Sequence, residues 1–181
     1  CPEAMGLGRT PQYKPTNILW ISDIPENWDV KKIFQVANEK HVSNKGVNHQ
    51  NLLSLSYGNI IRKNINTTDG LLPESFETYQ IVDKGDIILR FTDLQNDHRS
   101  LRTGLVKETG IITSAYICIS PRPEINSEFL HWVLHISDIK KVFYGMGGGL
   151  RQNLNYKEFK TFDVPIPPKE EQDSIVAYID K

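Results

Sequence analysis

The order in which strand-like and helix-like segments follow one another constrains the fold of this chain most. Apolar and polar residues alternate in "NLLSLSYGNI", which predicts a half-buried strand, and "GIITSAYICISP", rich in β-branched and aromatic residues, predicts another. Between them, "ETYQIVDKGDIILRF" indicates two extended stretches joined around Gly85. The best internal helix, "NSEFLHWVLHISDIKKVFY", comes after these strands, with Asn126 or Ser127 as its cap and Gly145 as its stop. Because the strands are grouped, we expect an α+β domain with a twisted, mixed β-sheet and a few short helices.

Three shorter segments complete the expected domain. One short helix is expected over residues 29–39, with Ile33, Phe34 and Ala37 facing inward, and another over residues 156–161. Residues 1–15 show no periodic pattern and are expected to form a loose arm. The globular domain would then span residues 16–166.

The chain closes with an extended, proline-rich stretch that leads directly into a helix. In "FDVPIPPKEEQDSIVAYIDK" the prolines favour an extended backbone, and Pro168 can take the first helical position, where its missing N–H costs no hydrogen bond. Acidic residues then lie at the positive end of the helix dipole. Ile175, Val176 and Ile179 form one apolar stripe. The pattern is still running at Lys181, so residues 167–181 are expected to begin a longer helix in the natural gene product.

Composition is that of an ordinary globular protein and excludes several classes. The 181 residues suit one domain, with 39% hydrophobic and 24% charged residues. The sequence has neither an apolar run of about 18 residues nor a signal-peptide pattern. Its two cysteines are too few for a disulfide framework or a zinc site, and Cys118 is expected to be a small buried apolar residue. A cytoplasmic location without membrane association is therefore expected.

The net charge of −1 gives no general indication of a nucleic-acid partner, but charge is unevenly distributed. Residues 31–63 contain six basic residues and one acidic residue, whereas residues 163–180 contain five acidic residues and one lysine. This asymmetry favours an anionic partner for the first part and a different partner for the last part. The alternative is that both parts are simply solvated faces.

Patterns that would predict catalysis or a bound cofactor are weak. The glycines of "YGMGGG" follow a helix rather than a strand, and Leu150 stands where a dinucleotide-binding fingerprint needs its last glycine. His131 and His135 have the spacing of a zinc-binding helix, but Trp132 replaces the required glutamate, so both are expected at ordinary surface or boundary positions. A metal-dependent nuclease needs a carboxylate followed two residues later by lysine, and such pairs are no more frequent here than chance predicts. The catalytic tetrapeptide of a DNA methyltransferase, Asn/Asp-Pro-Pro-Tyr/Phe, does not occur in the sequence. We therefore expect no catalytic residue, no metal ligand and no cofactor bound by this chain.

One polar segment between two predicted strands, "RFTDLQNDHRSLRTG", is rich in side chains that read base edges in DNA. Arginine recognises guanine, asparagine and glutamine recognise adenine, and aspartate recognises cytosine. A simple phosphate-binding strip would instead be mostly lysine and arginine. A polar hairpin loop that satisfies its own hydrogen bonds is the alternative. The residues expected to contact DNA are Arg90, Thr92, Asn96, Asp97, Arg99 and Arg102, with base contact favoured for Asn96 and Asp97.

Two further segments are candidate DNA-contacting surfaces. The first lies in and after the strand predicted in "NLLSLSYGNI" and comprises Ser54, Ser56, Tyr57, Arg62 and Lys63. The second is the glycine-rich loop, because glycine amides can approach anions closely and polar side chains follow at once. Its candidates are Gly148, Arg151, Gln152 and Asn153. For this second segment, the alternative is a flexible loop that only ends the preceding helix.

Three stretches of the sequence resemble a known family. "DIILRFTDLQNDHRSLRTGLVKETGIITSAYICI" and "GGGLRQNLNYKEFKTFDVPIPPKEEQDSIVAYID" are similar to the DNA-specificity subunit of type I restriction-modification systems. "IPENWDVKKI" resembles the opening of that family's target recognition domains. The resemblance covers residues 18–181. Its most specific part is "PIPPKEEQDSIVAYID", which in the family leads from a recognition domain into a long spacer helix.

The resemblance implies a non-catalytic role in a larger complex. The family's subunit carries two recognition domains, each reading half of a split double-stranded DNA sequence, and two helices that pair as an antiparallel coiled coil. It docks modification subunits, which transfer a methyl group from S-adenosylmethionine to adenine, and the assembly recruits an ATP-dependent restriction subunit. S-adenosylmethionine, ATP and Mg²⁺ would therefore belong to partner subunits. Ile175, Val176 and Ile179 would pack against the partner helix or against their own domain.

The chain departs from the family pattern because a second domain and a second helix are missing. It is expected to be a fragment, a half-subunit that pairs with a second copy, or the product of a truncated gene, and a paired half-subunit would read a gapped palindrome. Three alternatives stay open. One is a metal-dependent nuclease or methyltransferase fragment using Glu158 and Lys160, and another is a protein-interaction module whose polar loop binds an acidic protein. The third is a recognition domain of a fused, single-chain restriction enzyme.

Overall fold

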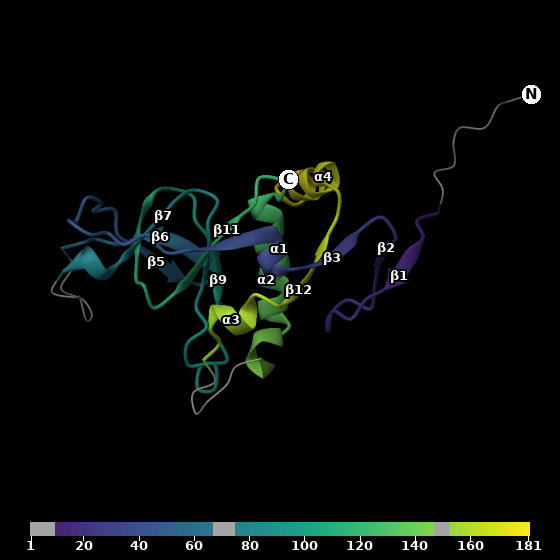
Figure 1. Cartoon of the computed structure of the whole chain (residues 1–181), viewed down its shortest axis with the longest axis horizontal. Helices are drawn as coiled ribbons and strands as arrows, with labels where there is room; N and C mark the ends of the chain where they lie inside the picture. Colours follow the sequence, from purple (N-terminus) through teal and green to yellow (C-terminus); the bar gives the residue numbers. More distant parts are fainter. Residues whose placement is uncertain (1–9, 67–74, 147–152) are drawn as a thin grey trace, which may run out of the picture.

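The computed structural model describes residues 10–66, 75–146 and 153–181, which form an α+β domain built around one helix (Figure 1). This fold class is the one expected from the sequence. The helices are α1 (Ile33–Val36), α2 (Ser127–Ile139), α3 (Tyr156–Phe159) and α4 (Lys169–Ile179), with 3₁₀ turns η1 (Phe76–Thr78) and η2 (Val142–Gly145). The strands are β1 (Tyr13–Pro15), β2 (Asp23–Pro25), β3 (Asp29–Lys32), β4 (Ala37–Lys40), β5 (Leu53–Ser56), β6 (Asn59–Arg62), β7 (Gln80–Val82), β8 (Ile87–Leu89), β9 (Thr103–Leu105), β10 (Gly110–Ile112), β11 (Ile117–Pro121) and β12 (Asp163–Ile166).

The strands are divided among several small sheets. The largest has four antiparallel strands in the order β4-β11-β8-β9. The other pairs are β1–β2, β5–β6, β7–β10 and β3–β12, which are also antiparallel, and Leu52 and Ile111 form an isolated parallel bridge. The strands on either side of Gly85 are confirmed, but β7 and β8 belong to different sheets. Gly85 has φ of +95°, which suits glycine at this turn.

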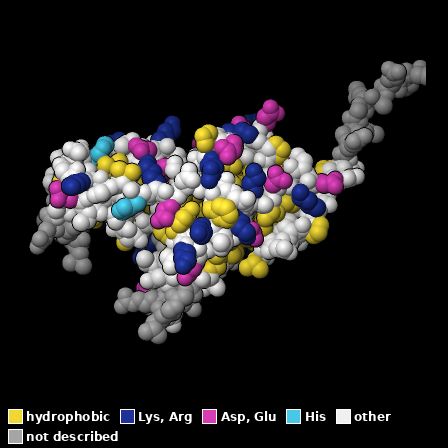
Figure 2. All heavy atoms as spheres, in the orientation of Figure 1, with side chains coloured by type: hydrophobic (Ala, Val, Ile, Leu, Met, Phe, Trp, Pro, Cys, Tyr) yellow, Lys and Arg dark blue, Asp and Glu magenta, His cyan; other side chains and the backbone are white. Residues whose placement is uncertain are grey.

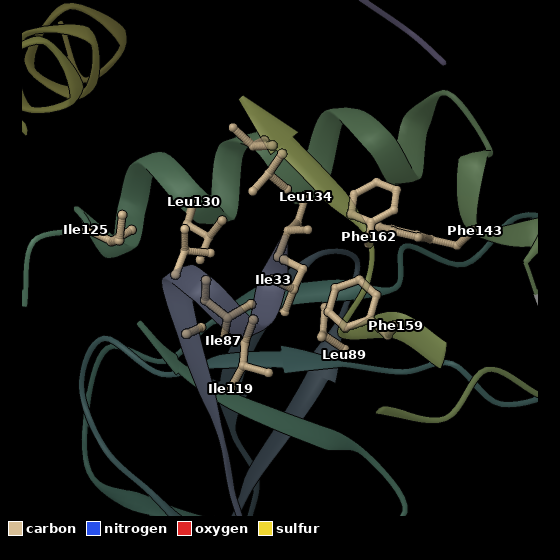
Figure 3. Packing of buried hydrophobic residues seen from close by; sticks show 14 of the residues in the cluster. Ile33, Ile87, Leu89, Ile119, Ile125, Leu130, Leu134, Phe143, Phe159 and Phe162 are labelled. Atoms are coloured by element: carbon tan, nitrogen blue, oxygen red, sulfur yellow. The ribbon is translucent and has the colours of Figure 1, made fainter. Parts of the chain in front are cut away.

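Helix α2 covers the four-stranded sheet and supplies much of the core. Its cap is Asn126, as expected, whose side-chain oxygen accepts hydrogen bonds from the backbone N–H groups of Glu128 and Phe129 at 3.0 and 3.2 Å. Leu130 and Leu134 point from α2 toward the isoleucines of the sheet (Figure 3). The expected helix and its cap are confirmed, but α2 ends at Ile139 rather than running to Gly145, and Ile136 and Ile139 are exposed.

A cluster of phenylalanines connects the core to the loops at the lower edge of Figure 1. Phe91, directly after β8, lies 4.9 Å (ring centroids) from both Phe143 of η2 and Phe159 of α3. Phe162 packs on Phe143 and Phe159 at 5.4 and 5.8 Å (Figure 3). The contacts of Phe91 fix the start of the loop that follows β8.

Residues 29–39 are not the single helix expected from their spacing. Only Ile33–Val36 are helical, and the flanking strands pair with distant partners, β3 with β12 and β4 with β11. Ile33 and Ala37 are buried as expected, but Phe34 is 44% exposed. Long-range strand pairing has overridden a weak local helical pattern.

Two other expectations also need correction. "GIITSAYICISP" forms two strands, β10 and β11, because the chain turns between Thr113 and Tyr116. Gln80 holds this turn, since its side-chain amide donates to the carbonyls of Thr113 and Tyr116 at 3.1 and 2.7 Å. The N-terminal arm is shorter than expected, because Tyr13–Pro15 pair with Asp23–Pro25; residues 1–9 lie outside the described part of the chain.

Helix α4 is confirmed and is fastened to the domain at its N-terminal end. Pro168 is its cap rather than its first residue. The Trp28 indole N–H donates to Glu171 at 2.9 Å, and the buried Gln172 side chain accepts from the Asn126 N–H at 2.8 Å. No helix among the described residues is long and apolar enough to cross a membrane.

The apolar stripe on α4 divides into buried and exposed positions. Val176 is buried in the domain's own core and Ile175 packs partly against it, whereas Ile179 is 42% exposed. The first two residues therefore pack against their own domain, one of the two roles expected for them. Packing of Ile179 against a partner helix stays a prediction.

Candidate nucleic-acid interface

The described parts of the three predicted DNA-contacting segments lie next to one another. The loop between β8 and β9, residues 90–102, hangs at the lower edge of Figure 1 beside the C-terminal end of α2. The Asp93 N–H donates to the Asn153 side-chain oxygen at 2.8 Å, which joins this loop to the segment after the glycine-rich stretch. A Cβ on Gly58, in the β5–β6 turn, would lie 3.0 Å from Leu101. Gly148, Arg151 and Gln152 lie outside the described residues.

Two of the predicted residues in the loop of residues 90–102, called here the recognition loop, are exposed to solvent. Arg99 is exposed, and its guanidinium has no hydrogen-bond or ion-pair partner in the described part of the chain. Asn96 is exposed, and its side-chain amide donates to the Asp93 carboxylate at 2.8 Å. Arg90 and Thr92 are half-buried at the base of the loop. Of the predicted residues here, Arg99 and Asn96 are the best placed to contact DNA, and their contacts stay predictions.

Asp97 shapes the loop from within. One of its carboxylate oxygens accepts hydrogen bonds from the backbone N–H groups of Arg99 and Ser100, at 3.1 and 3.0 Å. Hydrogen bonds from Ser100, through its side chain and its backbone, hold the pKa of Asp97 well below its usual range. Asp97 is therefore ionised at neutral pH, with one oxygen committed to the turn.

Arg102 is the main correction to the predicted site. Its side chain is fully buried, so it cannot contact DNA in this conformation. The guanidinium instead donates to the backbone carbonyls of Thr92 at 2.7 Å and of Asp97, and more weakly to the Arg90 carbonyl at 3.4 Å. These carbonyls belong to a loop that has no strand partner for them, and arginine has enough donors to satisfy several at once. Arg102 therefore holds the loop closed.

Two residues of α2 and η2, which the sequence did not indicate as important, complete this anchor. The Asp138 carboxylate accepts the backbone N–H of Arg102 at 2.6 Å, and the Tyr144 ring lies 5.5 Å from the Arg102 guanidinium carbon. Burial raises the pKa of Asp138. Its position one turn after Leu134, on the buried face of α2, was the available signal.

The β5–β6 hairpin presents the second predicted segment. Tyr57 and Gly58 form a two-residue turn with φ of +48° and +77°, so Tyr57 does not continue the strand, and its side chain is 90% exposed. Ser54 and Ser56 are half-buried, and Lys63 is exposed. Arg62 is engaged in an ion pair with Glu108, with one contact of 2.7 Å between Nε and a carboxylate oxygen. This pairing reduces the charge that Arg62 can offer to DNA.

A cavity of about 540 Å³ lies between the hairpin turn, the recognition loop and α2. Its lining includes Tyr57, Leu101 and, from α2, Trp132 and the pair His131 and His135. Both histidines lie at partly buried boundary positions, as expected, with their imidazole rings 6.0 Å apart. Burial, followed by the proximity of His135, lowers the pKa of His131 to about 4, and His131 is therefore neutral at physiological pH.

Charges of both signs are mixed over the face of the molecule shown in Figure 2, without a continuous basic patch. The described residues contain no group of three or more histidine, cysteine or acidic side chains placed to bind a metal ion. Glu158 and Lys160, on which the nuclease alternative rests, are both exposed.

The fold and this surface together define a class of protein: a small α+β domain that presents a polar loop at one end of a helix and packs a second helix at the other end. Three solved structures share the fold. They are the HsdS subunit from Thermoanaerobacter tengcongensis (17% identity, 88% of this chain and 38% of that chain, TM-score 0.55), a structure described for complex assembly and conformational transition of the type I R-M system (14%, 88% and 39%, 0.53), and the type I restriction-modification S subunit from M. genitalium (16%, 85% and 38%, 0.53).

The model of the type I restriction modification DNA specificity domain matches residues 25–181, so the chain belongs to this family. The chain spans about two fifths of the length of the solved structures that it matches. A search of the curated proteins finds no significant match.

Proposed function

We propose that this chain recognises a specific double-stranded DNA sequence as the specificity subunit, or part of it, of a type I restriction-modification complex. The observation that carries the proposal is the recognition loop, whose backbone is fixed by the buried Arg102 while Asn96 and Arg99 stay exposed. Membership of the DNA-specificity domain family supports the same function. A fixed loop supports sequence discrimination because little conformational entropy is lost when DNA binds.

The side chains available on the loop favour direct base readout. An arginine such as Arg99 can donate two hydrogen bonds to guanine in the major groove, and an asparagine such as Asn96 can pair with adenine. Each such contact discriminates against the wrong base by about 1–3 kcal/mol. Tyr57, exposed at the neighbouring hairpin turn, would add a contact from the side of the loop.

The remaining activities would belong to partner subunits. We propose that modification subunits, holding S-adenosylmethionine, methylate adenine in the sequence that this chain selects. A restriction subunit using ATP and Mg²⁺ would join through the assembled complex. A second copy of the chain, or a second specificity domain, would supply the other half-site, and such a role would place the protein in the cytoplasm with the DNA that it reads.

The test is selection from a random duplex library by the chain together with its modification subunit, at two salt concentrations. We expect enrichment of a half-site of about three to five base pairs. In Arg99→Ala the base preference should disappear at one position of this half-site, because one base contact is lost. Lys45→Ala, which removes an exposed charge from the segment between β4 and β5, is the matched control and should leave the enriched sequence unchanged. Binding without any enrichment would contradict the proposal. Competition by an acidic protein, but not by DNA, would favour the protein-interaction alternative instead.

A further inference from the structure

Lys141, at the junction of α2 and η2, has an unusual backbone conformation. Its φ and ψ are +59° and +26°, in the left-handed region that glycine and asparagine adopt most easily. The residue follows Lys140, which caps the end of α2, and the chain reverses direction there. A lysine held in this region is strained, and strained residues persist where the surrounding structure or function requires that side chain.

The Lys141 side chain extends to the tip of the recognition loop. Its ammonium donates a hydrogen bond to the backbone carbonyl of His98 and lies 5.0 Å from the centre of the Tyr144 ring. The His98 ring stacks on the same tyrosine, with 4.8 Å between ring centroids and 18° between planes. His98 is therefore held through both its carbonyl and its ring.

Two cationic side chains hold different parts of the loop. Arg102 binds carbonyls at residues 90, 92 and 97, whereas Lys141 binds the carbonyl of His98, next to the exposed Arg99. A glycine at position 141 would make the same chain reversal without strain, but it could not reach the loop. The left-handed backbone conformation is unfavourable for lysine, but the long cationic side chain makes a contact with the loop that glycine could not make.

We propose that Lys141, together with Tyr144, is a positioning residue that holds the tip of the recognition loop in its DNA-reading conformation before DNA arrives. The inference rests on the proposed function and deepens it. It assigns Lys141 an effect through His98 and the loop backbone, rather than a phosphate contact of its own. Residues outside the loop would then influence which base Arg99 reads.

The test combines hydrogen exchange of the free chain with DNA binding by the chain and its modification subunit. The contacts of Lys141 and Tyr144 with His98 are called here the clasp. Lys141→Ala should accelerate hydrogen exchange of the amides at residues 97–100 by about tenfold. Exchange of the core amides should not change, because the clasp is local. It should weaken specific binding about fivefold to tenfold more than Lys140→Ala, which removes an equal, exposed charge from the neighbouring residue. Lys141→Arg should restore both properties. Lys141→Gly should lose loop protection while its melting temperature stays equal to or above that of the wild type.

The readouts separate the possible failures. Unchanged exchange at residues 97–100 in Lys141→Ala would overturn the clasp, whatever happens to DNA binding. A lower salt dependence than in Lys140→Ala, with unchanged loop exchange, would make Lys141 a phosphate contact and would also overturn the proposal. If the wild-type chain selects no sequence, the proposed function fails and the DNA-reading part of the inference fails with it. The exchange experiment alone would still decide whether the clasp exists.

Discussion

Replacing Arg102 by methionine should destabilise the protein even though the residue lies in a segment rich in DNA-reading side chains. Methionine keeps most of the apolar stem but removes the guanidinium, which leaves the carbonyls of Thr92 and Asp97 without their donor. An unsatisfied buried polar group costs about 1–3 kcal/mol, so two carbonyls give a loss of about 2–6 kcal/mol in the free energy of unfolding. The loop can open to water, which keeps the loss near the lower end of this range.

Urea unfolding followed by tryptophan fluorescence measures this change directly. The matched control is Arg99→Met, which makes the same substitution at an exposed position three residues away and should alter the free energy of unfolding by less than about 0.5 kcal/mol. The two variants should therefore differ in stability, while both lose DNA discrimination, one through loop opening and the other through a lost contact. Equal stabilities of Arg102→Met and Arg99→Met would refute the anchoring role of Arg102.

Three further changes test other parts of the structure. Burial lowers the pKa of His131 from 6.5 to about 4, so the folded state disfavours the protonated ring. The free energy of unfolding is therefore fully present above pH 6.5 and falls by up to about 3 kcal/mol as the pH is lowered toward 4. His131→Gln should lack this decrease when unfolding is measured against pH. Gly110→Ala would place a Cβ 2.6 Å from a backbone carbonyl oxygen and should cost about 1–3 kcal/mol by urea titration. Gln172→Ala removes the buried acceptor of the Asn126 N–H and should lower the urea midpoint by an equivalent of about 1–3 kcal/mol, whereas Tyr178→Ala, 79% exposed on the same helix, should not. Unchanged pH dependence in the first, or unchanged midpoints in the others, would contradict these assignments.

Elements with strong local signals were predictable from the sequence. The cap at Asn126 and the helical spacing of the apolar residues after it predicted α2, and alternation in residues 53–56 predicted β5. Residues 29–39 were not predictable in the same way, because β3 pairs with β12, and Val30 lies opposite Pro165 far along the chain. A local window contains no information about such a partner.

The candidate site divides in the same way. Composition indicated the loop between β8 and β9 as a candidate, because polar side chains of several kinds gather between two strands, but it could not separate the exposed Arg99 from the buried Arg102. Arg102 immediately precedes β9, and its burial depends on how that strand meets α2. Tyr144 and Lys141 act on the loop from a segment about forty residues away, so only the folded chain brings them together.

Helix α2 is attached to α4 at one end and to the base of the recognition loop at the other. At one end, Asn126 binds Asp173 of α4 at 2.8 Å, and at the other, Asp138 binds the backbone of Arg102 at the base of the recognition loop. Asn126 and Asp138 are twelve residues apart, which is about 18 Å along the helix axis. The exposed loop positions can therefore be exchanged without shifting α4, provided that the attachments stay. A domain built in this way is suited to grafting: new loop sequences could be inserted as cassettes while the position of α4 on the domain is inherited unchanged.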